Sequence, residues 1–131
     1  AEILNSLPIY TRFFNLNFEQ VTSLFEIIQL SRENNIKLFF VETPKYLKIV
    51  KNKTYRVIMK EYMTLLAAEN VQMIVTNQTF SAYLEMKDTK LSLIKAYDFD
   101  SSNAAYFQDL IHLSTAGKEA FSAALSELIE K

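Results

Sequence analysis

The residues best suited to chemistry are the only histidine of the chain, His112, and Asp109, three positions before it. A carboxylate held against one imidazole nitrogen fixes the tautomer of the ring, so that the other nitrogen faces outward as a general base. The three-residue spacing lets the two side chains meet within a tight turn. An Asp-x-x-His sequence also arises by chance, with the histidine packed near a helix start and the aspartate an ordinary turn residue. The elements around the pair decide between these two interpretations.

The pair lies in the connection that enters the last helix of the chain. Ser114 is a suitable N-cap for this helix, and Phe121, Ala124 and Leu128 recur on one apolar face. Two helix-to-strand units precede the connection, and in open α/β sheets the loops at the carboxyl ends of the strands form the ligand crevice. This context favours the catalytic interpretation of Asp109 and His112.

The two helix-to-strand units predict an α/β fold in which helices pack on a mostly parallel sheet. Helices are predicted within residues 17–34 and 53–69, and each is followed by a strand, at residues 36–42 and 71–77. Short, nearly continuous apolar runs are typical of strands that are buried on both faces. We therefore expect residues 36–42 and 71–77 to be neighbouring parallel strands, joined by the second helix.

Two further segments are less defined. Residues 77–103 are predicted to be mostly loop, with a short helix around Phe80 and either a strand or a helical turn at residues 91–94. A further strand is predicted within residues 3–14, although Pro8 leaves its boundaries open.

The composition excludes several classes of protein. Half of the 131 residues are apolar, which suits one domain with a core of ordinary size, and Phe39 or Phe40 is expected to be largely buried in that core. Lys and Arg (14) nearly balance Asp and Glu (15) without a long run of either sign, so the charge predicts no nucleic-acid or polyanion partner. No apolar run approaches the roughly 18 residues of a spanning helix, so no membrane span is expected. The compartment stays open.

The single glycine, Gly117, and the lack of cysteine limit the cofactors. One glycine cannot build a Gly-rich nucleotide loop, and a chain without cysteine has no disulfide, thiolate chemistry or Cys-ligated zinc. Asp98 and Asp100 would suit a divalent ion together with His112, but solvated loop acids are the preferred interpretation. The sequence therefore predicts neither a cofactor nor a metal.

The residues around the pair resemble the closing motif of a known family. Phe107, Asp109, His112, Leu113, Ser114 and Gly117, followed by an amphipathic helix with Phe121, are similar to the end of the SGNH (GDSL-like) hydrolases and their acyltransferase relatives. Specific matches lie in residues 106–121, and residues 17–131 match in the order of helices and strands. The resemblance implies a three-layer α/β/α fold. It also implies ester hydrolysis or acyl transfer through a serine on an acyl-ester substrate, with His112 as the base and Asp109 orienting it.

The nucleophile of that family is missing from this chain. The family carries it in a Gly-Asp-Ser motif and uses a further Gly and Asn as the oxyanion hole, whereas the only glycine here is Gly117. Ser6 lacks the required glycine, and its spacing to His112 is too short. Residues 1–131 are therefore expected to be either a single α/β domain or the C-terminal half of a larger SGNH-like domain, and the start at Ala1 rather than Met favours the second.

Further expectations follow from this partial match. The isolated chain is expected to be inactive, and a homodimer or an N-terminal segment of the same protein is expected to cover apolar surface left by absent strands. The alternative hypothesis is a non-catalytic α/β binding or scaffold domain that has lost the nucleophile. A receiver-like or flavodoxin-like module would need acidic or Gly-rich loops after the first strand, and these are not found.

The segment after the first predicted strand contains three further candidates, Glu42, Thr43 and Tyr46. They either line the crevice beside His112 or belong to a loop that simply turns the chain.

Overall fold

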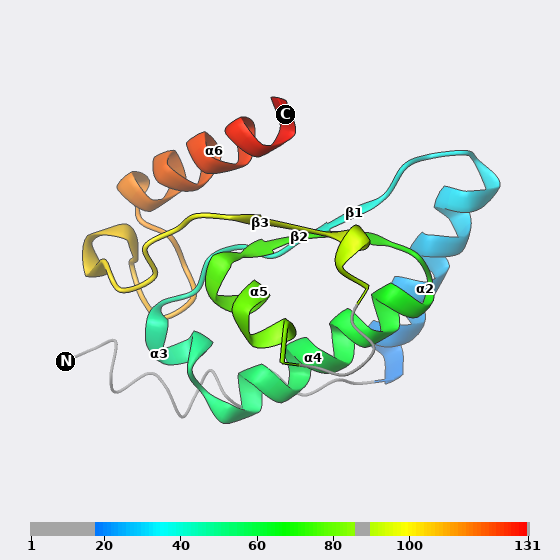
Figure 1. The fold of residues 1–131 in the computed structure, drawn as a ribbon, viewed down its shortest axis with the longest axis horizontal. Helices are drawn as coiled ribbons and strands as arrows, with labels where there is room; N and C mark the ends of the chain where they lie inside the picture. The colour runs from blue at the N-terminus through cyan, green and yellow to red at the C-terminus, as the bar shows by residue number, and fades with distance from the viewer. Residues whose placement is uncertain (1–17, 86–89, 131) are drawn as a thin grey trace.

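The computed structural model describes residues 18–85 and 90–130, which form helices around a small parallel sheet (Figure 1). In chain order the elements are α2 (Phe18–Glu33), β1 (Phe39–Val41), α3 (Leu47–Val50), α4 (Lys53–Ala68), β2 (Gln72–Thr76), α5 (Asn77–Tyr83), β3 (Ile94–Tyr97) and α6 (Thr115–Glu130), with 3-10 turns at Leu91–Leu93 and Ala104–Tyr106. Ser6 and the strand predicted within residues 3–14 lie outside the described residues.

The sheet has the order β1-β2-β3, and both pairs of neighbours are parallel. Phe39 lies opposite Gln72 in the first pair, and Met73 lies opposite Ile94 in the second. The prediction of two neighbouring parallel strands joined by a helix is therefore confirmed, with α4 as that helix. The first strand is shorter than predicted, because its ladder covers Phe39–Val41 rather than residues 36–42.

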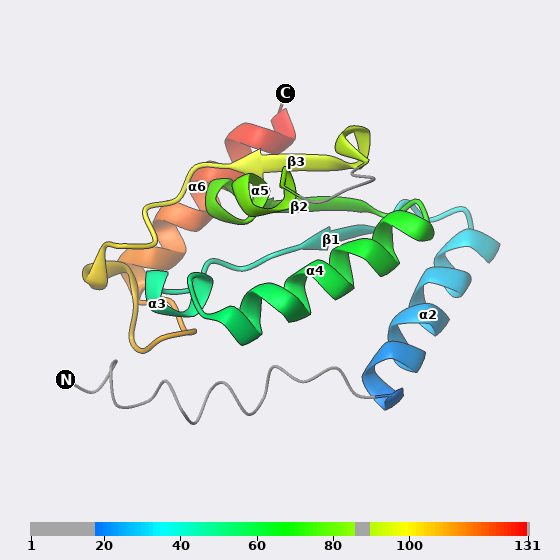
Figure 2. The same cartoon turned by 60° about the horizontal axis from the view of Figure 1, so that its bottom comes forward.

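Helices cover both faces of the sheet, as Figures 1 and 2 show. Side chains alternate between the two faces along a strand. Met73 and Val75 of β2 face α2, α4 and α5 in one buried cluster, and Ile74 faces α6 in a second. The α/β class is thus established, with the described helices packed on a three-stranded parallel sheet.

Residues 77–103 contain more regular structure than predicted, because β3 lies in this segment, and the helical turn allowed at residues 91–94 is the 3-10 turn Leu91–Leu93. The short helix predicted around Phe80 is present, and it begins directly after β2, where the Thr76 side chain accepts a hydrogen bond from the Thr79 backbone N at 3.2 Å. The third strand has only four residues, and Lys95 on it is exposed. So short and mixed a segment gives a weak apolar signal.

Burial on both faces holds for β2 but not for β1. The three residues Met73, Ile74 and Val75 are at most 5% exposed, whereas Phe39 is 38% exposed. In the described sheet β1 is an edge strand, and of the three strands only β2 and β3 contribute residues to the cluster beneath α6. Phe40, on the other face, packs against the buried cluster of α2 and α4. Of the two phenylalanines expected to be candidates for the core, Phe40 is thus the one that packs against it, partly buried, and Phe39 is exposed.

Asparagines end the two long helices that precede strands. Asn35 follows α2 with φ 55°, and Asn70 follows α4 with φ 57°. Asparagine tolerates this left-handed conformation better than most residues and replaces glycine at helix ends. An ion pair of 2.9 Å between Arg32 and Glu69 joins the same two helix ends.

Among the residues that the structure describes, no helix has both the length and the apolar character needed to cross a bilayer.

Candidate functional site

Asp109 and His112 lie on a closed loop between β3 and α6. Phe107 and Leu113 form an antiparallel bridge across its base, and the Gln108 backbone N donates to the His112 carbonyl at 2.8 Å. These contacts bring the two ends of the loop together. The five residues between them are therefore held in one narrow turn.

The Asp109 carboxylate organises this turn. Its Oδ1 accepts hydrogen bonds from the backbone N of Ile111 at 2.9 Å and of His112 at 2.7 Å. Nδ1 of the His112 ring lies 2.8 Å from Oδ2 and 3.0 Å from Oδ1. Since an ionised carboxylate only accepts, Nδ1 is the donor, and Nε2 of the neutral ring is left as a basic nitrogen. The predicted contact between Asp109 and His112 is thus present.

The His112 ring is open to solvent. Its side chain is 63% exposed, against 30% for that of Asp109. The loop is anchored at the carboxyl end of β1, because the Tyr46 backbone N donates to the Leu110 carbonyl at 2.9 Å. Leu110 itself is fully buried against Ile49. One side of the loop is therefore fixed in the core, and the other presents the imidazole.

The start of α6 fixes the far side of the loop. The Ser114 hydroxyl accepts from the Gly117 backbone N at 3.2 Å and donates to the Ala105 carbonyl at 2.6 Å. A Cβ on Gly117 would lie 1.9 Å from the Tyr106 carbonyl oxygen, far inside van der Waals contact. The predicted N-cap role of Ser114 is confirmed, and the Ser-x-x-Gly spacing reflects the close packing of α6 on the turn Ala104–Tyr106.

Glu42 is a buried carboxylate rather than part of a surface beside His112. It is 5% exposed, and its Oε2 accepts from the hydroxyls of Tyr55 at 2.8 Å and Thr79 at 2.7 Å. Its Oε1 accepts from the Thr76 backbone N at 2.9 Å. The hypothesis that Glu42 lines the crevice is therefore wrong. The carboxylate ties the end of β1 to α4 and to the junction of β2 and α5.

Two tyrosines beside Glu42 are held as hydrogen-bond donors. Burial, and then the Glu42 carboxylate, raise the pKa of Tyr55 and the pKa of Tyr97. The Tyr97 hydroxyl donates to the Glu42 carbonyl. Both hydroxyls thus stay protonated under ordinary conditions, which suits their role as donors to a buried acceptor.

Of the other residues after β1, Tyr46 lies at the loop and Thr43 lies next to a lysine. The Tyr46 ring meets the ring of Phe107 edge to face at 5.5 Å between centroids. Exposed Thr43 accepts hydrogen bonds from Lys45 through its hydroxyl and its carbonyl. Burial lowers the pKa of Lys45, and the Glu42 charge opposes this effect. Of Glu42, Thr43 and Tyr46, it is Tyr46 that contacts the loop of Asp109 and His112.

The alternative of a metal site at His112 gains no geometric support. Within residues 18–85 and 90–130, no group of three His, Cys, Asp or Glu side chains is close enough to hold a metal ion. Asp100 instead accepts from the backbone N of Ser102 at 3.1 Å, as a turn residue does. Asp98 is exposed. The structure therefore does not bring Asp98 and Asp100 together with His112.

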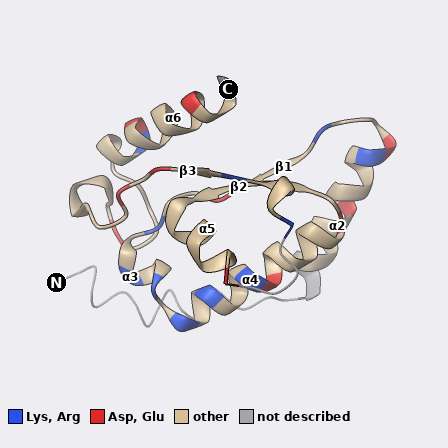
Figure 3. Ribbon diagram, viewed as in Figure 1, with Lys and Arg blue, Asp and Glu red and all other residues tan. Residues whose placement is uncertain are grey.

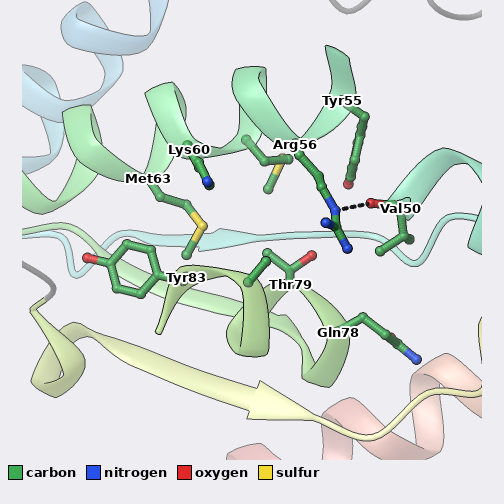
Figure 4. A pocket seen from close by; sticks show the side chains of 10 residues that line it. Val50, Tyr55, Arg56, Lys60, Met63, Gln78, Thr79 and Tyr83 are labelled. Carbon is green, nitrogen blue, oxygen red and sulfur yellow. Dashed lines mark hydrogen bonds between the residues drawn. The ribbon is translucent and has the colours of Figure 1, made fainter. Parts of the chain in front are cut away.

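Among the described residues, the side-chain hydrogen bonds of His112 go to Asp109, and no serine takes part. A narrow cavity of about 20 Å³ lies between α3, α4 and α5, where Figure 4 shows Met63 and Tyr83 on its two sides. It holds about one water molecule and is lined by neither Asp109 nor His112. We therefore place the candidate site at the exposed imidazole and not in this cavity.

Sequence reasoning missed the residues that hold the loop. Leu110 belongs to an apolar pair, Leu110 and Ile111, between the two polar site residues, and this pattern could have marked it as an anchor. The hydrogen bonds from Tyr55 and Thr79 to Glu42 join residues 13 and 37 positions apart, so no local pattern predicts them.

Comparisons of the sequence and the structure with known proteins found no matching protein-family model, no matching curated protein and no matching solved structure.

Proposed function

We propose that this chain is the C-terminal part of an SGNH-type serine ester hydrolase or acyltransferase and supplies its Asp109 and His112. One observation carries the proposal: the Asp109 carboxylate holds Nδ1 of His112 at 2.8 Å on an exposed loop after the last parallel strand. This arrangement orients Nε2 toward solvent as a general base. The helices on both faces of the sheet suit a three-layer α/β/α fold that further strands of the family would extend.

The mechanism that follows is acyl transfer in two steps. A serine from outside this sequence attacks the ester carbonyl of an acyl substrate, and Nε2 of His112 takes the hydroxyl proton as the new C–O bond forms. When the tetrahedral intermediate collapses, the leaving alcohol departs with that proton. Water or an acceptor alcohol then attacks the acyl-serine in the same way, and the serine regains its proton from His112. Asp109 stabilises the transient imidazolium throughout.

The loop geometry supports this role because the base is preorganised. Backbone donors from Ile111 and His112 fix the Asp109 carboxylate, and buried Leu110 fixes the backbone between the pair. A base held in this way needs little reorganisation when the reaction begins. Gly117 packs against the Tyr106 carbonyl and is therefore not available for an oxyanion hole. On this proposal the oxyanion hole and the nucleophile come from residues outside this sequence.

The test uses the coding sequence upstream of Ala1 and the protein that it specifies. We expect a Gly-Asp-Ser segment there, and ester hydrolysis by the longer protein that His112→Ala and Asp109→Asn both greatly reduce. The Asn amide cannot hold the same tautomer, and such a change in a serine protease lowers kcat by about 10⁴. The 131-residue chain alone should show no more activity on activated esters than its His112→Ala variant. A longer protein with full activity in both variants would contradict the proposal.

A non-catalytic binding or scaffold domain is the second candidate. It is favoured by the observation that the described side-chain bonds of His112 go to Asp109 and not to a serine. On this hypothesis the upstream coding sequence lacks a Gly-Asp-Ser segment, and the Asp109 and His112 pair serves only to close the loop. His112→Ala would then lower the free energy of unfolding without changing any reaction rate.

A further inference from the structure

A basic surface covers α3 and the first half of α4. Its members are Lys45, Lys48, Lys51, Lys53, Arg56 and Lys60. Figure 3 shows the basic positions gathered around these two elements. No acidic residue lies between Thr43 and Lys60, so all 15 acidic residues and the other eight basic ones lie elsewhere. The nearly balanced total charge of the chain conceals this local excess of positive charge.

Carboxylates of the described residues form no ion pair with the exposed members of the basic surface, and the buried Glu42 charge acts on Lys45 alone among its members. All of its members except the half-buried Lys45 are exposed. In the part of the chain that the structure describes, Arg32 forms an ion pair with Glu69, and no member of the basic surface forms one. Glu42, the acidic residue just before the segment, is buried beneath Tyr55 and Thr79. Cations without ion pairs remain available to an external anion.

Helix stability explains the lysines at the end of α3, where Lys48 lies in the last turn and Lys51 is the C-cap, but it does not explain the cations of α4. Neither α3 nor α4 has an acidic residue in its first turn, where an acid would favour the partial positive charge of the helix N-terminus. Lys53 is the first residue of α4 instead, and Lys53, Arg56 and Lys60 share one face at helical spacing, where like charges repel. Arg56 also donates to the Val50 carbonyl at 3.3 Å, as Figure 4 shows. An anion bound at this surface would relieve the repulsion.

The basic surface and the loop of Asp109 and His112 belong to one packing unit. Leu110, between the two site residues, is buried against Ile49 of α3 and Tyr55 of α4. The backbone N of Tyr46, just before α3, donates to the Leu110 carbonyl at 2.9 Å. The elements that carry the cations are therefore the elements against which the loop rests. A polymeric substrate with its ester at His112 would have α3 and the start of α4 on the side of the loop that Leu110 anchors.

We propose that the basic surface binds the anionic part of the acyl substrate, which is then a polymer rich in carboxylate or phosphate groups. Release of small counterions from such a polymer drives its binding to clustered lysines and makes the affinity depend on salt. The inference rests on the proposed function for the place of the ester. The affinity of the surface for a polyanion can be measured without any reaction.

The experiment measures binding of the 131-residue chain to two soluble probes, inorganic polyphosphate and polygalacturonate, over a series of salt concentrations. The test variant combines Lys48→Gln with Lys51→Gln, and the matched control combines Lys37→Gln with Lys95→Gln, so that both lose two exposed charges. We expect the test variant to bind more weakly. The slope of log affinity against log salt should fall by about one for each lost contact, while the control behaves as the parent.

The two probes distinguish phosphate from carboxylate as the preferred group. Equal losses in the test and control variants would overturn the proposal, because net charge alone would then govern binding. Binding to vesicles of anionic phospholipid without binding to either soluble probe would also overturn it, in favour of a membrane surface. If the 131-residue chain binds polyanions selectively but the longer protein lacks esterase activity, the proposed hydrolase fails and the polyanion surface stands. If the longer protein is an active esterase but the chain binds neither probe, the polyanion surface fails and the proposed hydrolase stands.

Discussion

At the scale of single residues, the loop of Asp109 and His112 is held by backbone contacts that side chains complete. Asp109 accepts from two backbone N–H groups, Ser114 caps α6, and Gly117 lets the Tyr106 carbonyl approach the helix. Each of these contacts restricts the residue type: Asp109 must supply a short acceptor, Ser114 a capping oxygen, and Gly117 the absence of a side chain. Substitutions at these positions are therefore expected to act on the loop as well as on overall stability.

Gly117→Ala should lower the free energy of unfolding by about 1 to 3 kcal/mol, as overpacking typically does. The new methyl group would lie 1.9 Å from a backbone oxygen, which cannot rotate away as a side chain can. Chemical denaturation measures the loss. Ala123→Ser, at an exposed position of the same helix, is the control and should change stability by much less. If Gly117→Ala is as stable as the parent, α6 can move away from the Tyr106 carbonyl without a loss of stability, and the prediction is contradicted.

The buried network of Glu42 makes stability depend on alkaline pH. Tyr55 has a pKa raised above its ordinary value of 10.0 by burial and by Glu42, so the unfolded chain loses this proton first as pH rises. The contribution of Tyr55 is therefore complete below about pH 10 and is lost above it. Urea unfolding across this range should show a steeper fall for the parent than for Tyr55→Phe. Both proteins retain Tyr97 and Lys45, so parallel curves would contradict the assignment to Tyr55.

At the scale of elements, long periodic patterns predicted structure well and short ones did not. The helical stripe within residues 53–69 corresponds to α4, and the continuous run from Val71 corresponds to the central strand β2. β3 was missed because four residues with one exposed lysine carry little periodicity. The apolar run at β1 is typical of a buried strand. Burial depends, however, on the neighbouring strands and helices, and a short apolar run does not predict these.

Truncation of core residues should separate the central strand from the edge strand. Met73→Ala should lower the free energy of unfolding by about 2 to 5 kcal/mol, because Met73 is fully buried between α4 and α5 and a cavity would remain. Phe39→Ala should cost much less, since Phe39 is 38% exposed before the change. Chemical denaturation of both variants under the same conditions gives the comparison. A loss at Phe39 as large as at Met73 would mean that β1 is covered in solution.

At the scale of the whole molecule, the position of the candidate site could be predicted and its surroundings could not. An Asp-x-x-His spacing before a capped helix was enough to predict the contact that the structure shows at 2.8 Å. The anchoring of the loop on α3 and α4 depends on residues such as Tyr46 and Ile49, more than 60 positions earlier in the chain. Contacts of this range follow from the packing of the sheet and have no local sequence signature.

The free edge and open face of β1 predict association. In the described sheet β1 pairs with β2 alone, and Ile36, Phe39 and Val41 around it are 62%, 38% and 37% exposed. An unpaired strand edge beside exposed apolar side chains favours pairing with another chain or segment. We expect sedimentation of the 131-residue chain to show self-association that increases with concentration. The variant Phe39→Ser with Val41→Thr should shift the population toward monomer, because it removes the apolar part of the contact and leaves the core of the sheet in place.

The control for this association replaces exposed apolar residues away from β1. Val57→Thr with Ile129→Ser removes side chains that are 50% and 66% exposed on α4 and α6. If β1 forms the contact, this control should associate as the parent does, because neither residue adjoins the free edge. If both double variants weaken association equally, general surface hydrophobicity is the cause. A parent chain that stays monomeric at every concentration would contradict self-pairing of β1 and leave its edge to a segment of a longer protein.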